Sequence, residues 1–336
     1  MIRDRNLKNR VYNLNHEIEL IFSPGLRLDT FLFQNLEDKF SRTFLQKMIK
    51  KGQVSINSEI IVKPSATVKT ASLLKIQITE QPSFSLEPSQ IKIPVIFQDE
   101  HLAILHKPAY MTVHPGAGTG NDTLVHSLMG QFESLAPTND ITRPGIVHRL
   151  DRETEGLMII ALSASALEKL SLMFAERSIA KTYLAWAWGS HLPEKAKISG
   201  FIHRNPRNRK LMEFTEIENS TGRQKKASLS YETLLNVNGF AKLKIQLETG
   251  RTHQIRATFL AKNAPIVGDK LYIRKINKTS NTEPIRGLKN EHHGLLLLSQ
   301  SLEFIHPITG NPMKFSLEEP QRFKDFEDLV SKLNPQ

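Results

Sequence analysis

The chain has 336 residues, of which 39% are hydrophobic and 24% charged, as in globular rather than disordered proteins. It contains no cysteine, which excludes disulfides, thiolate nucleophiles and cysteine-ligated zinc or iron–sulfur sites. Lys and Arg number 45 against 34 Asp and Glu, so the formal net charge is +11. This excess predicts a polyanionic partner, either nucleic acid or a membrane surface.

The N-terminus and the apolar runs favour a protein without a membrane anchor. Met1-Ile2-Arg3-Asp4-Arg5 is too charged for a signal peptide. The longest apolar stretch, 156–167, has 12 residues, whereas a membrane-spanning helix needs roughly 20. We therefore expect a soluble, cytoplasmic protein. No pattern in the sequence indicates an oligomer, so a monomer is the default expectation.

The first predicted domain, 18–79, is small and of mixed α/β type. One helix is predicted after Gly25 with Asp29 as its N-cap, and a second from Ser41 to Gly52. Strand-like runs follow at 54–56, 60–62 and 73–78. Residues 80–90 contain Pro82 and Pro88 among polar residues, which is typical of a linker.

The larger predicted domain, 91–320, alternates strand-like and helix-like segments and indicates an α+β fold rather than a doubly wound sheet. A capping box of Ser165 and Glu168 predicts one helix start. The polar segment 273–292 is predicted to be an insertion, and 321–336 a C-terminal helix or tail. The remaining predicted elements are strands at 101–106, 157–162 and 240–248, and a helix at 123–132.

Known cofactor and metal motifs are missing from the sequence. There is no Walker A sequence, no His-Glu-x-x-His and no Gly-x-Ser-x-Gly. The glycine-rich run 116–120 lacks the third glycine of a dinucleotide fingerprint, because Asn121 follows it. His292 and His293 lack spaced partners for a metal. We therefore expect neither cofactor nor metal.

Three short segments could carry chemistry. In the first, 145–158, Asp151 lies near arginines just before an apolar strand, so it forms either a structural ion pair or a catalytic carboxylate. In the second, 250–256, Arg251 and Arg256 could reach one carboxylate and one phosphate, or both could be solvated. In the third, Tyr183 could pack, stack on a base or transfer a proton.

These segments together resemble the motifs of the RluA-type pseudouridine synthases. His148-Arg149-Leu150-Asp151-x-x-Thr154-x-Gly156-Leu157 resembles the family signature. The other matching motifs, in chain order, are His106-Lys107-Pro108 with His114-Pro115-Gly116, Lys181-x-Tyr183, Gly250-Arg251-Thr252-His253-Gln254-Ile255-Arg256, Pro265-Ile266-Val267-Gly268-Asp269-x-x-Tyr272 and Leu302-x-Phe304-x-His306-Pro307. Residues 25–78 are more loosely similar to the S4 RNA-binding domain, and the stretch 113–118 to the RluD subgroup.

The resemblance implies a fold and a reaction. The fold is a mixed, largely antiparallel sheet with flanking helices and loops, and the reaction isomerises uridine in RNA to pseudouridine without a cofactor. Asp151 is implied as the nucleophile, paired with Arg251, while Tyr183 stacks on the target base and is a candidate general base. Arg149 is a hypothetical filler of the space that a flipped base leaves. Glu155 departs from the family pattern, which usually has Ser or Thr there, and Ser58 stands where the S4 turn often has Gly.

The expected partner is RNA, most readily large-subunit ribosomal RNA as a precursor or a particle, since an S4-like domain precedes the catalytic core. Alternatives are a transfer-RNA synthase, a non-catalytic RNA-binding ribosome assembly factor and a glycosidase-like hydrolase. The last requires a second placed carboxylate, for which only Glu153 and Glu155 are near in sequence. Predicted RNA-contacting residues are His148, Arg149, Arg42, Lys47, Lys50, Lys51, Arg204, Arg207, Arg209, Lys210 and Arg256.

Overall fold

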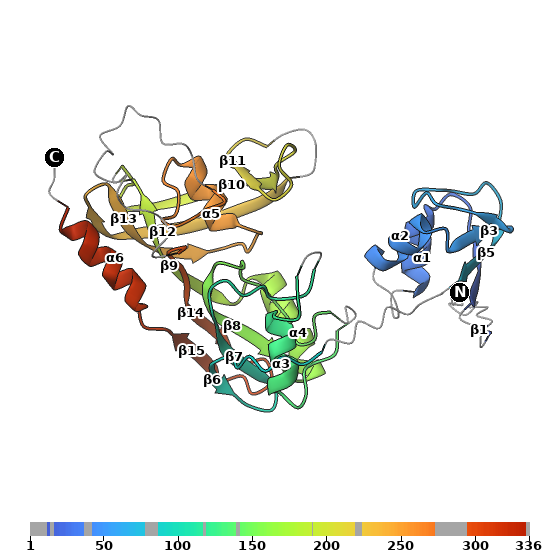
Figure 1. Cartoon of the computed structure of the whole chain (residues 1–336), viewed down its shortest axis with the longest axis horizontal. Coiled ribbons are helices and arrows are strands. Elements are labelled where there is room, and N and C mark those ends of the chain that lie inside the picture. The colour runs from blue at the N-terminus through green and yellow to red at the C-terminus, as the bar shows by residue number, and fades with distance from the viewer. Residues whose placement is uncertain are drawn as a thin grey trace, which may run out of the picture. The chain divides into compact units, whose positions relative to one another are not determined.

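A computed structural model describes residues 12–13, 17–36, 42–77, 87–116, 119–138, 142–189, 191–218, 224–272 and 294–333. The chain forms two compact units (Figure 1), Met1–Ser85 with Pro137–Pro144, and Leu86–Ala136 with Gly145–Gln336. The predicted insertion at 273–292 and the pair His292-His293 lie outside the described residues. Among those described, no helix combines the length and the apolar character needed to cross a bilayer.

The N-terminal unit packs two helices against a five-stranded antiparallel sheet of order β1-β2-β5-β3-β4. Apolar residues alternate along β2, and Ile18, Leu20 and Phe22 are buried against the helices, as a half-buried strand requires. The bounds are β1 Tyr12–Asn13, β2 Glu17–Phe22, α1 Leu28–Leu36, α2 Arg42–Lys50, β3 Val54–Ile56, β4 Glu59–Ile60 and β5 Ser72–Gln77. The strand predicted at 60–62 is therefore placed too late, since β4 ends at Ile60.

Asp29 does not cap α1, contrary to the prediction. It is the second residue of the helix and is fully buried. Its Oδ1 accepts a hydrogen bond from Arg27 Nε at 3.0 Å, and its Oδ2 accepts one from Gln46 Nε2 at 2.8 Å. The carboxylate thus links α1 to α2, because a buried charge is tolerated only with such partners.

The second unit is built on a long sheet of order β11-β10-β12-β13-β9-β14-β8-β7-β6, with β15 paired to β14. This confirms the predicted α+β class with a largely antiparallel sheet. The bounds are β6 Val95–Gln98, β7 Leu102–Lys107, α3 Leu124–Gln131, β8 Glu155–Ala161, α4 Ala164–Glu176, β9 Ala180–Trp188, β10 Lys195–Arg204, β11 Met212–Thr215, β12 Lys225–Val237, β13 Phe240–Leu247, α5 Gln254–Ala261, β14 Leu297–Ile305, β15 Pro312–Ser316 and α6 Gln321–Ser331.

The two halves of this sheet join at the β14–β8 pair, which we call the seam. The seam is parallel and its register covers only Leu298↔Glu155 and Ser299↔Gly156. The other pairings within this sheet, in the described part of the chain, are antiparallel. Gly156 has φ of 125°, and a β-carbon there would come within 2.3 Å of Ser299 O. Only glycine allows this close approach of the two backbones.

Helices cover the sheet on both sides of the seam. Phe323 and Phe326 of α6 pack against Trp186 of β9 and Phe240 of β13. At the start of α4 the N-cap is Ser163 and not the predicted Ser165, because Ser163 Oγ accepts from Ala166 N at 3.3 Å. The prediction was wrong by two residues: only Ser165 has the Glu three residues later that a capping box requires, yet the helix already begins at Ala164.

Candidate active site

Three chain segments converge on one pocket in the second unit. Asp151 lies four residues before β8, Tyr183 lies on β9, and the segment 250–256 leads into α5. These segments come from both sides of the seam and line a cavity of about 110 Å³. An adjoining cavity of about 630 Å³ shares Arg149 and Asp151 and extends to Lys210. The sheet therefore brings together residues that are far apart in sequence.

Asp151 is held by Arg256. The distance from Arg256 Nη1 to Asp151 Oδ2 is 3.3 Å, and the same nitrogen lies 3.2 Å from Glu153 Oε2. The rest of the guanidinium binds Asp269 in a fork, with Nε–Oδ2 at 2.7 Å and Nη2–Oδ1 at 2.9 Å. Such a fork fixes the plane of the guanidinium and therefore the direction from which it meets Asp151.

Burial by itself disfavours the charge of Arg256, which is 1% exposed. The hydrogen bonds and charge of Asp269, followed by the charges of Asp151 and Glu153, outweigh burial and raise the pKa of the guanidinium above its usual value. Arg256 is therefore a permanent cation beside Asp151. Its guanidinium is already engaged by Asp269, Asp151 and Glu153, and the RNA-contacting role predicted for Arg256 stays a prediction.

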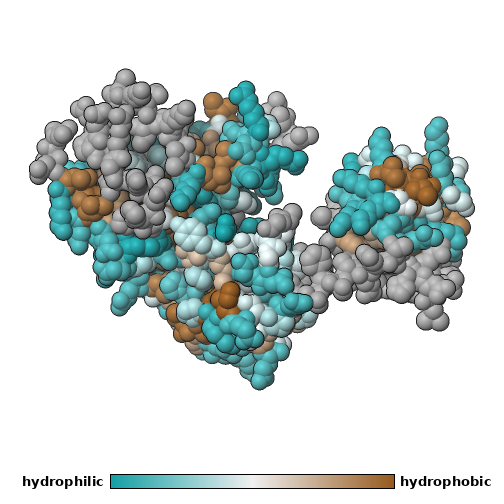
Figure 2. Space-filling view, viewed as in Figure 1, coloured by the Kyte–Doolittle hydropathy of each residue, from teal (hydrophilic) through white to brown (hydrophobic). Residues whose placement is uncertain are grey.

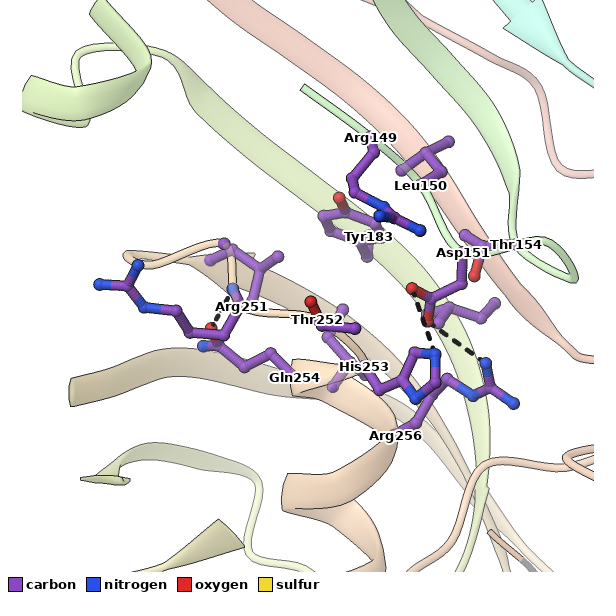
Figure 3. A pocket seen from close by; sticks show the side chains of 14 residues that line it. Arg149, Leu150, Asp151, Thr154, Tyr183, Arg251, Thr252, His253, Gln254 and Arg256 are labelled. Carbon is purple, nitrogen blue, oxygen red and sulfur yellow. Dashed lines mark hydrogen bonds and ion pairs between the residues drawn. The ribbon is translucent and has the colours of Figure 1, made fainter. Parts of the chain in front are cut away.

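The predicted pairing of Arg251 with Asp151 is wrong. Arg251 Nε donates to Lys226 O at 3.2 Å, and Figure 3 shows its side chain directed away from Asp151. The backbone explains why Arg256, and not Arg251, contacts Asp151. His253 has φ of 53° and turns the chain just before α5. After this turn Arg256 lies on the side of the helix that faces Asp151. A catalytic role for Arg251 stays a prediction, and any such role does not run through contact with Asp151.

His253 is a site residue to which the sequence analysis assigned no role. Its Nε2 lies 3.9 Å from Asp151 Oδ1, and its Nδ1 lies 2.9 Å from Tyr272 Oη. Tyr272 Oη also accepts from Met212 N at 2.8 Å. Burial lowers the pKa of His253, so the ring is neutral at neutral pH. The sequence signal that could have identified His253 as a site residue is its position between Arg251 and Arg256 in one motif.

Tyr183 faces the same pocket from β9 and is 7% exposed. Burial raises its pKa to about 12, and a hydrogen bond with Ser299 opposes this only in part. The phenol is therefore protonated at neutral pH. Its ring remains available to stack on a base, whereas its pKa disfavours the general-base role.

Arg149 is exposed and lies on the rim shared by the cavities around Asp151. Figure 3 shows its side chain extending over Tyr183 toward Asp151. His148 lies behind this rim, where its ring stacks on Phe174 at 4.5 Å and its Nε2 accepts from Ile159 N at 2.9 Å. Burial lowers the pKa of His148 to about 3. His148 is thus a neutral ring that packs on Phe174, and the RNA contact predicted for it stays a prediction.

The other predicted RNA-contacting residues belong to two groups, one on α2 and just after it in the N-terminal unit, and one at the end of β10 and the turn that follows it in the second unit. Arg42 is the first residue of α2. Lys47 and Lys50 are exposed in the last turn of this helix, and Lys51 is exposed directly after it. Arg204 is the last residue of β10, and Arg207, Arg209 and Lys210 lie on the turn between β10 and β11; all four are exposed. Asn205 orders this turn, because its Oδ1 accepts from Arg207 N at 2.8 Å and Asn208 N at 2.7 Å.

The reaction chemistry available here is nucleophilic. A carboxylate with one oxygen toward an open pocket can form a covalent adduct, and the arginine behind it stabilises its ionised form. In the described part of the chain, no three His, Asp or Glu side chains are grouped to hold a metal.

A sequence model of a family, described as RNA pseudouridylate synthase, matches residues 101–261. An uncharacterized RNA pseudouridine synthase of Aquifex aeolicus is 33% identical over 92% of this chain and 95% of that protein. Ribosomal large subunit pseudouridine synthase D of Zymomonas mobilis is 33% identical over 88% of this chain and 91% of that protein. The chain belongs to the RNA pseudouridine synthase family.

The synthase therefore isomerises uridine in RNA to pseudouridine, and the resemblance to RluA-type enzymes is confirmed. A solved human protein, RNA Pseudouridylate Synthase Domain Containing 1, has the same fold, with a TM-score of 0.53 at 22% identity over 72% of this chain and 87% of that one. The predicted pseudouridine synthase fold is thereby confirmed as well. The assignment of 18–79 to the S4 type stays a prediction.

Proposed function

We propose that this synthase modifies large-subunit ribosomal RNA and that Asp151 is its nucleophile. The observation that carries the role of Asp151 is its geometry: one oxygen is held by buried Arg256, and the carboxylate lines the open pocket beside Tyr183. The ribosomal substrate is supported by the similarity to the large-subunit synthase of Zymomonas mobilis, and by the basic α/β unit that precedes the catalytic one.

In the proposed reaction the N1–C1′ bond of uridine breaks and a C5–C1′ bond forms. The hydrogen on C5 leaves as a proton, and N1 takes up a proton, so atoms and electrons balance without a co-reactant. Asp151 forms a transient covalent adduct with the target nucleotide, which divides one difficult step into easier ones. Tyr183 stacks on the uracil during these steps, and its protonated phenol leaves the base role to another group.

The target nucleotide must leave its stack to reach Asp151, at a cost of a few kcal/mol. Arg149 is the proposed residue that fills the vacated space, because it is exposed on the rim and extends over Tyr183 (Figure 3). An Arg149→Ala variant should lose more activity on a structured RNA than on an unstructured one. Equal losses on the two RNAs would remove this role.

A hydrolase that releases free uracil is less well supported. Such an enzyme needs a carboxylic acid that donates a proton across the bond from a second carboxylate. Glu153 does lie near Asp151, but both face the same Arg256 nitrogen as acceptors. They are therefore on one side of the site rather than opposed across it.

The deciding experiment is tritium release from RNA that carries uridine labelled at carbon 5. Unmodified large-subunit ribosomal RNA, transfer RNA and an assembling large-subunit particle are compared, with wild type and Asp151→Asn. Release from ribosomal RNA or the particle by wild type alone supports the proposal. Release from transfer RNA alone reassigns the substrate, release by Asp151→Asn removes the role of Asp151, and free uracil supports the hydrolase.

A further inference from the structure

A second cavity, which we call the cationic pocket, lies beside the reaction pocket. It has a volume of about 300 Å³ and shares Arg149, Tyr183, Gly250 and Arg251 with the reaction pocket. Its own wall adds residues from the end of α4 and the start of β9. A group bound in it is therefore directly next to the group that lies on Tyr183.

Lys181 is the central cation of this pocket. It lies two residues before Tyr183 on β9, so both side chains leave the same face of the strand. Its Nζ lies 5.4 Å from the centre of the Phe174 ring, and 3.8 Å from where a β-carbon on Gly250 would be. Burial, together with the charge of Arg177, lowers the pKa of Lys181.

No carboxylate in the described residues forms an ion pair with Lys181 or Arg177. The one acidic side chain in the wall, Glu248, is bound by Lys197 Nζ, 2.6 Å from its Oε1, and by Ser228 Oγ, which donates to its Oε2 at 2.9 Å. The charge of Arg177 is the last of the causes that lower the pKa of Glu248, so Glu248 acts mainly on Lys197. The pocket thus gathers Arg149, Arg177, Lys181 and Arg251 around one carboxylate that is already bound to Lys197. A half-buried lysine in this state is stabilised by an anion that enters from solvent.

We propose that the cationic pocket binds the RNA backbone phosphate next to the target uridine, with Lys181 and Arg177 as its charged partners. This assignment rests on the proposed function, because the ligand is part of the RNA substrate. A phosphodiester fits the pocket, since it is an anion, is repeated at every nucleotide and offers two oxygens to two cations. The bound phosphate holds the target sugar over Asp151.

A purely structural role is the competing explanation. Arg177 is the C-cap of α4, in the left-handed conformation, and positive charges near a helix C-terminus stabilise the helix. In that case loss of charge at 177 or 181 lowers thermal stability but leaves RNA binding and its salt dependence unchanged. The two explanations therefore predict different measurements.

The first test uses Lys181→Gln, Arg177→Gln and the charge-preserving Lys181→Arg. Lys169→Gln is the matched control, because Lys169 is an exposed cation on the same helix, α4. For the two glutamine variants of the pocket we expect kcat/KM on an RNA hairpin with a mapped uridine to fall about tenfold, mainly through KM. The slope of log kcat/KM against log salt should become shallower by about 0.7 to 0.9 for each lost contact. Lys181→Arg should retain most of the wild-type slope, and Lys169→Gln all of it.

The second test finds the phosphate. Each linkage around the target uridine is replaced in turn by a neutral methylphosphonate. Wild type should lose about tenfold at one linkage, and Lys181→Gln should lose little further at that linkage while losing normally elsewhere. Additive losses at every linkage, or variants with lowered Tm and unchanged salt slope, overturn the phosphate site. Wild type without tritium release on any RNA overturns the proposed function itself, and this assignment with it.

Discussion

Arg322 of the C-terminal helix binds Glu155, the first residue of β8, with Arg322 Nε 3.1 Å from Glu155 Oε1. Arg322 Nη1 also donates to Leu295 O at 2.7 Å, just before β14. The Arg322 side chain thus links the first residue of β8 to the segment just before β14. Its partner Glu155 lies four residues after Asp151 in the chain. This pairing also accounts for Glu155, which replaces the Ser or Thr usual in the family.

Loss of Arg322 should loosen the seam. We expect Arg322→Gln to lower the free energy of unfolding by about 1–3 kcal/mol, because the partly buried Glu155 carboxylate loses a charged partner. It should also lower kcat several-fold, since Asp151 and Arg256 lie on opposite sides of the seam. Denaturant unfolding and single-turnover tritium release measure the two effects. Lys324→Gln, an exposed residue of the same helix, is the control.

A double-mutant cycle with Glu155→Gln separates the pair from the rest of α6. The coupling energy between the two substitutions should be about 1 kcal/mol or more, as for side chains in direct contact. Additive effects would show that Arg322 acts through Leu295 O alone.

Arg256, and not Arg251, should govern the reactivity of Asp151. Arg256→Lys keeps a charge but loses the fork to Asp269, so we expect kcat to fall by about a hundredfold or more. Arg251→Gln should change kcat much less, because its side chain does not contact Asp151. Single-turnover rates at saturating RNA compare the two. A larger loss of kcat in Arg251→Gln than in Arg256→Lys would contradict the geometry.

Tyr183→Phe should leave the shape of the pH profile unchanged between pH 6 and pH 9. The pKa of Tyr183 is raised to about 12, so the wild-type phenol stays protonated throughout this range. Stability should fall by about 1 kcal/mol through loss of the hydrogen bond with Ser299. A basic limb of kcat that is present in wild type and absent in the variant would instead identify Tyr183 as the general base.

Lys107 should make stability rise with pH. It is fully buried, its Nζ donates to Pro108 O at 2.7 Å and Met111 O at 3.0 Å, and burial lowers its pKa from 10.5 to about 8. Below pH 8 the lysine is protonated in both the folded and the unfolded chain, so the full cost of burying its charge lowers the free energy of unfolding. Between pH 8 and about 10.5 the unfolded chain binds more protons, so the free energy of unfolding rises with pH by this contribution.

Comparison with Lys107→Met isolates this effect. The difference in unfolding free energy between wild type and the variant should change in favour of wild type by on the order of 3 kcal/mol from pH 7 to pH 10.5. The carbonyl groups that the variant leaves without Nζ add a cost that does not depend on pH. A difference that stays constant with pH would show that Lys107 is not desolvated.

The sequence was sufficient for the class of fold, the family and the segments of the site. Hydrophobic alternation along 240–248 predicts the strand now seen as β13, and the segment around Asp151 predicts a carboxylate near arginines just before a buried strand. These features depend on local spacing, which a linear chain displays directly.

Only the tertiary structure decided which arginine meets Asp151. Arg251 and Arg256 are equivalent by charge and motif, and the choice depends on the left-handed turn at His253 and on Asp269, which fixes Arg256. The cationic pocket is likewise invisible in sequence, because Lys181 and Gly250 meet only when the strands pair. Contacts between distant residues depend on chain direction and packing, and local patterns do not encode these one by one.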